Sequence, residues 1–304
     1  MNRGQPAIHY APAKVNLWLS VGQRRADGYH SVDTVFLALG LADEISLSPA
    51  NQPGLQVDGD ASVPAGEDNL CWRVQELFAE NVPAARGRPQ RIHLRKRIPA
   101  GAGLGGGSAD AAAVLSALNE AFGTPLSPAR LRKLGAELGS DVPFFLSGSP
   151  MAIGSDRGQD VVALPAPPVR PVLILVPNFG ISTAQAYGWL DQDRGPEPIL
   201  RASSDWAPDE RAVLSGWEGI KALAANDFEA PVFRRFPVLE AGKSGLLEAG
   251  ATVALLCGSG SCLFGVFESS DDRDRAALVM AAETPTESTF RPIATHTMEP
   301  SQGC

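Results

Sequence analysis

One stretch of this 304-residue sequence, Pro99-Ala100-Gly101-Ala102-Gly103-Leu104-Gly105-Gly106-Gly107-Ser108-Ala109, places five glycines within seven residues, and an alanine-rich segment follows at once. Glycine lets the backbone adopt positive φ angles and lets another group approach the amide N–H groups closely. A helix that begins directly after such a loop leaves its first N–H groups unpaired, with a partial positive charge directed at the loop. Loop and helix together predict a phosphate site, and therefore a nucleotide-binding protein.

Three other interpretations of the glycines fit less well. A Rossmann loop requires a buried apolar strand before it and an acidic residue about twenty positions later. Here residues 91–98 are highly basic, and no acidic residue lies between Glu120 and Glu137. Gly242-Lys243-Ser244 ends like a Walker A loop, but Pro237 stands where its first glycine is required. A flexible linker would mix Gly with Ser and would not lead into a helix that Ser108 is placed to cap.

The composition agrees with that of a soluble metabolic enzyme. Hydrophobic residues make up 44% of the chain, enough for a substantial core, and no apolar run approaches the ~18 residues of a membrane span. A net charge of −8 argues against nucleic acid as a partner, because binding it requires a basic face. The four cysteines are scattered without a CxxC pair, and the first residues lack the apolar stretch of a signal peptide. We therefore expect neither zinc nor disulfides, and a cytoplasmic location.

The order of elements is mixed α and β. Alternating apolar residues predict a strand over 15–21 that turns at Asp27-Gly28 and returns over 32–39, with another short strand over 43–47. Asp68-Asn69 and Ser127-Pro128 are typical helix starts. Strands are also expected at 172–176, 251–256, 263–267 and 290–294. A proline-rich segment over 164–171 suggests a boundary, so the pattern predicts an α+β protein with two domains, 1–165 and 166–304.

Two further motifs accompany the glycine loop in a fixed order. Ala11-Pro12-Ala13-Lys14-Val15-Asn16-Leu17 stands before it, and Cys257-Gly258-Ser259-Gly260-Ser261-Cys262-Leu263-Phe264-Gly265 stands near the C-terminus. The three together resemble the three motifs of the GHMP small-molecule kinases. The resemblance implies a two-lobed fold with a ribosomal-S5-like N-terminal domain, a ferredoxin-like C-terminal domain and a substrate cleft between them. It also implies ATP and Mg²⁺.

Two more segments suggest a branch of that family. Arg25-Ala26-Asp27-Gly28-Tyr29-His30 and Gly139-Ser140-Asp141-Val142-Pro143-Phe144-Phe145 resemble the branch whose substrate carries a cytidine diphosphate. This resemblance implies phosphorylation of the 2-hydroxyl of 4-diphosphocytidyl-2-C-methyl-D-erythritol, in the non-mevalonate isoprenoid pathway. Another GHMP kinase, of the homoserine or mevalonate type, is the main alternative, but it leaves the Asp-Gly-Tyr-His block unexplained. A catalytically silent relative that senses a sugar nucleotide is an alternative of a different class.

Lys14 and Asp141 are the predicted catalytic pair. Asp141 lies where a polar turn enters an apolar segment; by itself it could be a helix cap or an Asx-turn, but the resemblance implies the catalytic base. The Lys14 ammonium can hold Asp141 ionised, orient the hydroxyl or contact the moving phosphoryl group. Asn16 is two residues further along the same strand, so it shares a face with Lys14 and is predicted to bind the same part of the substrate.

The resemblance also implies residues for the nucleotide and its metal. We expect left-handed backbone in the loop, including Gly106. Ser108 could offer its hydroxyl to a phosphate oxygen or to Mg²⁺, but no glutamate ligand is recognisable, so the metal ligands stay open. The residues predicted to bind ATP are Asn69, Leu70, Lys96, Pro99, Ala100, Gly101, Ala102, Gly103, Leu104, Gly105, Gly106, Gly107, Ser108 and Ala109.

The cytidine end of the substrate is assigned to Tyr29, His30, Thr183 and Tyr187, which lie in the two segments that match substrate contacts. A base between two aromatic rings gains roughly 1–3 kcal/mol per stacked ring. We therefore expect a small-molecule partner with a cytidine diphosphate group, no nucleic acid and no membrane, in a monomer or a homodimer.

Overall fold

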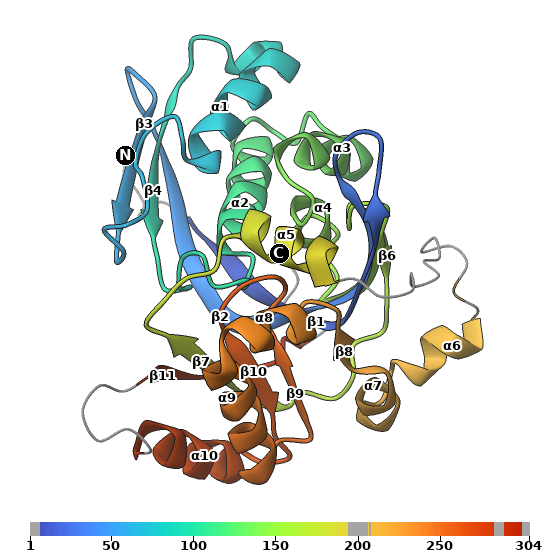
Figure 1. Ribbon diagram of the computed structural model, residues 1–304. Helices are drawn as coiled ribbons and strands as arrows, with labels where there is room; N and C mark the ends of the chain where they lie inside the picture. The colour runs from blue at the N-terminus through green and yellow to red at the C-terminus, as the bar shows by residue number, and fades with distance from the viewer. Residues whose placement is uncertain (1–6, 194–205, 207, 283–288, 300–304) are drawn as a thin grey trace.

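The computed structural model describes residues 7–193, 206, 208–282 and 289–299. It has two lobes, each with its own sheet (Figure 1). In the first lobe the strands follow the order β3-β4-β2-β1-β8, and β5 and β6 extend from β2. The strands are β1 (Ile8–Arg24), β2 (His30–Pro49), β3 (Gly54–Asp58), β4 (Gln90–Arg95), β5 (Met151–Ser155), β6 (Asp160–Ala163) and β8 (Ala225–Asn226).

A long hairpin of β1 and β2 is the centre of the first sheet. The two strands pair antiparallel from Arg24 and His30 at the turn to Ile8 and Ser46 at the far end, with shifts in register at three places along β1. The predicted hairpin turn at Asp27-Gly28 is confirmed, and Gly28 has a left-handed φ of 86°. The separate strand expected over 43–47 is instead the second half of β2, because the chain stays extended through Gly40.

Helices pack on one face of this sheet around a shared apolar core. They are α1 (Leu70–Asn81), α2 (Gly106–Ala121), α3 (Pro128–Leu138) and α4 (Val142–Phe145), with a short 3₁₀ turn η1 (Pro83–Ala85) after α1. The predicted helix starts are confirmed, because the side chains of Asn69 and Ser127 accept backbone N–H groups of α1 and α3. The small side chains of α2 are buried against the sheet, so the helix lies close to the strands, with its N-terminus at the glycine loop.

The second lobe is an antiparallel sheet in the order β11-β7-β10-β9, and it lies below the first in Figure 1. Its strands are β7 (Pro171–Pro177), β9 (Val253–Leu256), β10 (Leu263–Val266) and β11 (Phe290–His296), all at predicted positions. The helices of this half of the chain are α5 (Thr183–Asp193), α6 (Pro208–Val213), α7 (Trp217–Leu223), α8 (Glu229–Arg235), α9 (Pro237–Glu248) and α10 (Ser270–Ala282). The α+β, two-lobed architecture is therefore as predicted.

The two lobes are joined by more than one crossing of the chain. An apolar cluster contains residues of both sheets, including Val15 and Leu37 of the first and Ile174 and Phe264 of the second. Strand β8 pairs in parallel with β1. The segment after β11 returns to the first lobe, where the N–H of Met298 donates to Ala38 and its side chain joins the first core. The domain boundary near residue 165 stays a prediction.

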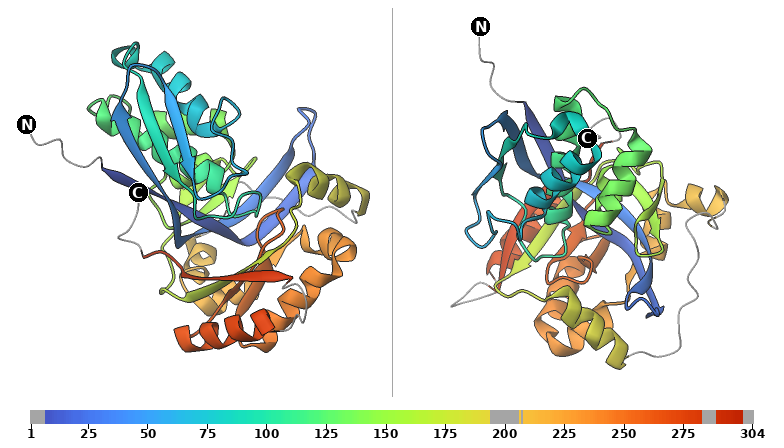
Figure 2. Two further views of the ribbon diagram at one scale, coloured as in Figure 1. Left: turned by 90° about the vertical axis from the view of Figure 1, so that its left-hand side faces the viewer. Right: turned by 90° about the horizontal axis from the view of Figure 1, so that it is seen from above.

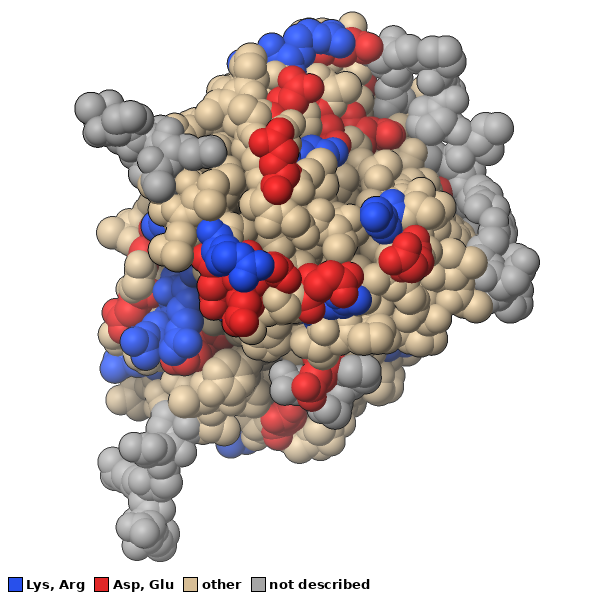
Figure 3. Space-filling model, turned by 90° about the horizontal axis from the view of Figure 1, so that it is seen from below, with Lys and Arg blue, Asp and Glu red and all other residues tan. Residues whose placement is uncertain are grey.

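Charges of both signs are interspersed on the face seen from below in Figure 3. On α10, at the bottom of Figure 1, Arg275 pairs with Asp272, and Arg273 pairs with Asp274. The net negative charge of the chain is thus not gathered into one patch on this face. None of the described helices is long and apolar enough to cross a membrane.

Candidate active site

The glycine loop joins β4 to α2 and approaches the cleft with its backbone. Gly101, Gly103 and Gly105 have left-handed φ angles of 66°, 78° and 73°, and Gly105 is the N-cap of α2. The left-handed backbone expected at Gly106 is wrong, because that residue is already helical. No side chain caps α2, so the N–H groups of its first turn are left for another acceptor.

The capping role predicted for Ser108 is also wrong. The helix begins at Gly106, three residues before the start that a Ser108 cap predicts, because Gly106 and Gly107 are already helical, and Ser108 is its third residue. A Cβ built on Gly139 would lie 3.7 Å from the Ser108 hydroxyl, so this oxygen faces the segment that carries Asp141. Ser108 therefore lies between the glycine loop and the predicted base, although it does not cap the helix.

The loop of the third motif meets the glycine loop backbone to backbone. A Cβ on Gly103 would lie 1.8 Å from the carbonyl oxygen of Cys257, and one on Gly260 would lie 2.4 Å from the Gly103 nitrogen. No side chain fits at either distance, so both positions require glycine. The Asn226 side chain donates to the carbonyls of Leu256 and Gly258, which holds the third-motif loop in place.

Lys14 and Asp141 form an ion pair at the centre of the site. The Lys14 ammonium lies 3.3 Å from a carboxylate oxygen of Asp141, and the side chains are 6% and 29% exposed. The Lys14 backbone N–H donates to the Leu104 carbonyl, so strand β1 is tied to the glycine loop. Asp141 precedes α4 without capping it, which leaves its carboxylate to the ion pair and the cleft.

Asn16 lies beside Lys14, as their shared strand face predicts. Its side-chain oxygen accepts from the Lys14 ammonium at 2.9 Å, and its amide nitrogen donates to the Thr34 hydroxyl at 2.7 Å. The Thr34 hydroxyl donates to the Trp18 carbonyl at 2.8 Å. A chain of buried hydrogen bonds thus runs from the β1 backbone to the catalytic pair.

A cleft of about 710 Å³ connects these elements. One end is formed by Gly103 and Gly105, and Lys14 and Asp141 lie along it. The other end lies between the tip of the β1–β2 hairpin and α5, which lie side by side in both views of Figure 2. The residues predicted for substrate and catalysis that line the cleft are Lys14, Asn16, Tyr29, His30, Asp141, Thr183 and Tyr187.

The hairpin end of the cleft is built from aromatic rings. Tyr187 lies against His30, with ring centroids 4.8 Å apart, and meets Phe228 edge-on. Burial, with a smaller contribution from the negative charge of Asp141, raises the pKa of Tyr187 to about 12. Tyr29 is exposed, with the Arg157 guanidinium 4.7 Å from its ring centre. That Tyr29 and Tyr187 enclose a base stays a prediction.

His30 is buried and held from two sides. One ring nitrogen lies 3.0 Å from the Gly22 carbonyl and the other 3.4 Å from an Asp191 carboxylate oxygen. Thr183, at the start of α5, accepts a hydrogen bond from the Ser259 hydroxyl, so α5 is linked to the third-motif loop. His30 is therefore held between β1 and α5, and Thr183 is held by the third-motif loop.

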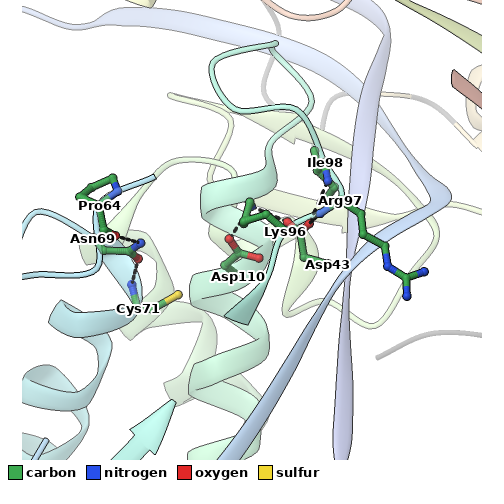
Figure 4. Close-up of polar contacts among 8 residues, drawn as sticks. All are labelled: Asp43, Pro64, Asn69, Cys71, Lys96, Arg97, Ile98 and Asp110. Atoms are coloured by element: carbon green, nitrogen blue, oxygen red, sulfur yellow. Dashed lines mark hydrogen bonds and ion pairs between the residues drawn. The ribbon is translucent and has the colours of Figure 1, made fainter. Parts of the chain in front are cut away.

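Lys96 and Asn69 are not among the residues that line the cleft. Lys96 lies next to the start of α2, 3.3 Å from a Cβ built on Gly106, and Figure 4 shows the polar partners of both residues. Lys96 is buried between Asp43 and Asp110, and the Asp43 carboxylate also accepts the N–H groups of Arg97 and Ile98. The Asn69 side chain caps α1 and donates to Pro64. Both side chains are thus engaged within the protein, and contacts of these segments, with Leu70, to adenosine stay a prediction.

The buried charges in this cluster shift each other's protonation. Burial raises the pKa of Asp110 to about 7, against the opposing effect of the Lys96 ammonium. Burial also lowers the pKa of Lys96, but the carboxylates of Asp110 and Asp43 outweigh it and raise that pKa overall.

Several cleft residues escaped the sequence analysis. Thr34 and Phe36 come from the return strand of the hairpin, and Arg24, Arg157 and Asp191 surround its tip. The Asp27-Gly28 turn places residues 32–39 opposite 15–21, so the sequence did indicate that Thr34 lies on the strand paired with that of Lys14 and Asn16. Arg157 and Asp191 had no such signal, since they reach the cleft only through tertiary packing.

Comparison with known proteins agrees with this geometry. Residues 69–149 match the model of the GHMP kinases N terminal domain, and residues 212–285 match that of the GHMP kinases C terminal domain. The chain belongs to the GHMP kinase family. This GHMP kinase is 39% identical over 274 residues to the 4-diphosphocytidyl-2-C-methyl-D-erythritol kinase of Moorella thermoacetica, covering 88% of this chain and 92% of that one. It is 40% identical over 286 residues to the enzyme of the same name from Solibacter usitatus, covering 92% and 85%.

Solved structures resemble the same GHMP kinase. A crystal structure of 4-(cytidine 5'-diphospho)-2C-methyl-D-erythritol kinase superposes with a TM-score of 0.76 at 36% identity, covering 96% of this chain and 100% of that one. Homoserine kinase from Cytophaga hutchinsonii superposes with a TM-score of 0.69 at 19% identity, covering 100% and 98%. The second likeness concerns the fold alone, whereas the first also extends to the sequence.

Proposed function

We propose that this GHMP kinase transfers the γ-phosphate of ATP to the 2-hydroxyl of 4-diphosphocytidyl-2-C-methyl-D-erythritol, a step of the non-mevalonate isoprenoid pathway. One observation carries the proposal. The Lys14–Asp141 pair lies in a single cleft whose one end is the glycine loop and whose other end is the aromatic hairpin tip. A kinase for an alcohol needs a phosphate site, a base and a site for the alcohol in that spatial order.

The reaction follows from this order. The triphosphate lies against the glycine loop and the N–H groups of the first turn of α2, with its γ-phosphate toward Lys14. Asp141 accepts the proton of the substrate hydroxyl as the hydroxyl oxygen bonds to the γ-phosphorus. The bond from the γ-phosphorus to the bridging oxygen breaks, and ADP leaves with the electron pair. The Lys14 ammonium offsets the negative charge that develops between donor and acceptor.

The residues present fit a Mg²⁺ ion that arrives with the nucleotide. The described residues contain no cluster of three or more His, Cys, Asp or Glu that could hold a metal by itself. Mg²⁺ commonly keeps several waters and relies on substrate phosphates, so few protein ligands are needed. Ser108, whose hydroxyl makes no cap to α2, would hold it together with the phosphates. When bound, the ion neutralises phosphate charge.

The cytidine diphosphate occupies the other end of the cleft in this proposal. The cytosine stacks between Tyr29 and Tyr187, with His30 and Thr183 beside it, and the cations Arg24 and Arg157 lie at the same end. These cations and Lys14 supply the local positive charge that a diphosphate requires in a chain of net charge −8. The oligomeric state and the cytoplasmic location stay predictions.

A coupled assay of ADP release against four alcohols tests the function. The panel is 4-diphosphocytidyl-2-C-methyl-D-erythritol, the same methylerythritol phosphate without its cytidylyl group, homoserine and mevalonate. We expect turnover with the first alone, with one new phosphomonoester signal in the ³¹P NMR spectrum of the product. Turnover of homoserine or mevalonate would favour those alternatives. Binding of the cytidylyl compound without turnover would favour a silent sensor.

A further inference from the structure

Thr34 occupies a position in β2 from which it reaches the catalytic pair only through another side chain. It is 1% exposed, and its hydroxyl lies between the Trp18 carbonyl and the side-chain amide of Asn16. The strand ladder at Thr34 uses backbone groups and does not need this hydroxyl. The hydroxyl therefore has a role beyond the strand itself.

The hydrogen-bond inventory fixes every direction in this chain. A carbonyl oxygen can only accept, so the single hydroxyl proton of Thr34 goes to Trp18. The Thr34 oxygen is then left to accept, and it can accept only from the NH₂ group of the Asn16 amide. Asn16 must consequently turn its carbonyl oxygen the other way, toward the Lys14 ammonium at 2.9 Å.

The orientation of the Asn16 amide determines whether the Lys14 ammonium beside it has a hydrogen-bond acceptor. Lys14 is an obligate donor, so a reversed amide would place NH₂ against an ammonium group and remove an acceptor from it. The ammonium is buried and faces Asp141 at 3.3 Å. A Cβ on Gly258 would lie 3.3 Å from the ammonium and 3.4 Å from the Asn16 oxygen, so the third-motif loop leaves little room for another arrangement.

We propose that Thr34 is a positioning residue of this kinase, which acts through Asn16 to hold the Lys14 ammonium on Asp141. The inference rests on the proposed function for its kinetic consequence, but not for its structural one. Thr34 donates nothing to the substrate in this role. Its hydroxyl defines which end of an amide faces the catalytic lysine.

Thr34→Val is the direct test, because valine has nearly the same shape and no hydroxyl. We expect kcat to fall roughly ten- to a hundred-fold, while KM for ATP stays within about two-fold. Thr34→Ser restores the hydroxyl and should recover most of the lost kcat. The matched control is Thr297→Val, since Thr297 is equally buried, accepts a hydrogen bond from the Arg170 N–H and does not line the cleft. It should change kcat less than two-fold.

A double-mutant cycle separates positioning from packing. If Thr34 acts through Asn16, Thr34→Val should lower kcat less than two-fold when introduced into Asn16→Ala. Additive losses in kcat would overturn the proposal, as would Thr34→Ser being as slow as Thr34→Val. If Thr34→Val does not fold, Thr34→Ala, which removes the hydroxyl without adding a methyl group, decides in its place.

A crystal structure of Thr34→Val supplies a readout that does not need turnover. We expect the Lys14 ammonium to have left Asn16 and to lie more than 4 Å from Asp141, with the backbone of β2 unchanged. An unmoved ammonium would overturn the proposal even if the parent were active. If the parent chain lacks turnover, the proposed function fails, and the position of Lys14 in this structure still decides the role of Thr34.

Discussion

The two ends of the cleft differ in which atoms form them, main-chain atoms at one end and side chains at the other. The end at the glycine loop, where we propose that the phosphates bind, is formed by backbone: Gly103 and Gly260 approach neighbouring main-chain atoms where no Cβ fits. The end at the hairpin tip, where we propose that cytidine binds, is formed by side chains: Tyr29 is 56% exposed and the Arg157 guanidinium lies over its ring. A backbone site tolerates almost no substitution, whereas a side-chain site can be rebuilt one residue at a time.

The largest effect is expected between the two ends, at Asp141. Asp141→Asn should lower kcat by roughly 10²–10⁴, the usual contribution of a general base, without changing the affinity for ATP. Stopped assays give kcat, and calorimetry gives ATP affinity. A variant that turns over within threefold of the parent would remove Asp141 from its role as base.

Gly103→Ala tests the backbone end. Its Cβ would lie 1.8 Å from the Cys257 carbonyl, on a backbone with a φ of 78°, so the loop must move. We expect ATP affinity, measured by calorimetry, to fall by about 100-fold or more, since several kcal/mol of strain are at stake.

Gly123→Ala is the matched control, because Gly123 has a φ of 81° but nothing within 4 Å of the new Cβ. It should show only the cost of left-handed backbone in stability and no change in ATP affinity. Equal ATP affinity in Gly103→Ala and the parent would mean that this loop does not carry the phosphates.

Replacing either Tyr29 or Tyr187 by Leu tests the side-chain end. The loss of one stacked ring should lower kcat/KM for the cytidylyl substrate by about five- to 150-fold, whereas KM for ATP should not change. Free cytidine diphosphate should compete with the alcohol and not with ATP. Tyr10→Leu is the control, since Tyr10 is 58% exposed and lies outside the cleft. Competition of cytidine diphosphate with ATP alone would refute the cytosine site.

The smallest effect is expected behind the glycine loop, at Asp110. Its pKa rises from the ordinary 3.8 to about 7 in the folded protein, so the native state binds an extra proton between these pH values. The contribution of this group to stability is therefore highest below pH 4 and falls as the pH rises to 7. Denaturant unfolding at pH 5 and at pH 8 measures how much the free energy of unfolding falls between these two pH values. We expect this fall to be smaller in Asp110→Asn than in the parent, by on the order of 1 kcal/mol. Identical pH dependence would contradict the assignment.

The sequence predicted those features that depend on local patterns or on the family motifs. The glycine loop, the hairpin and the Lys14–Asp141 pair belong to this group. Ser108 was predicted wrongly because the start of α2 depends on how far the glycines remain helical. The hairpin turn places Thr34 opposite the strand of Asn16, but the turn alone could not predict their contact, because it depends on shifts in register along β1. The ion pairs of Lys96 with two buried carboxylates had no sequence signal, because Asp43 and Asp110 come from distant segments; its contact with the nucleotide stays a prediction.

The return of the chain after β11 has a consequence for how the protein is made. Met298 belongs to the core of the first lobe and bonds to Ala38, although some 260 residues separate them in the sequence. Domains generally fold as units during synthesis, the N-terminal one first. Here the core of the N-terminal lobe stays incomplete until Met298 has been synthesised. Until then, the apolar side chains that pack against Met298 in the folded protein lack this partner.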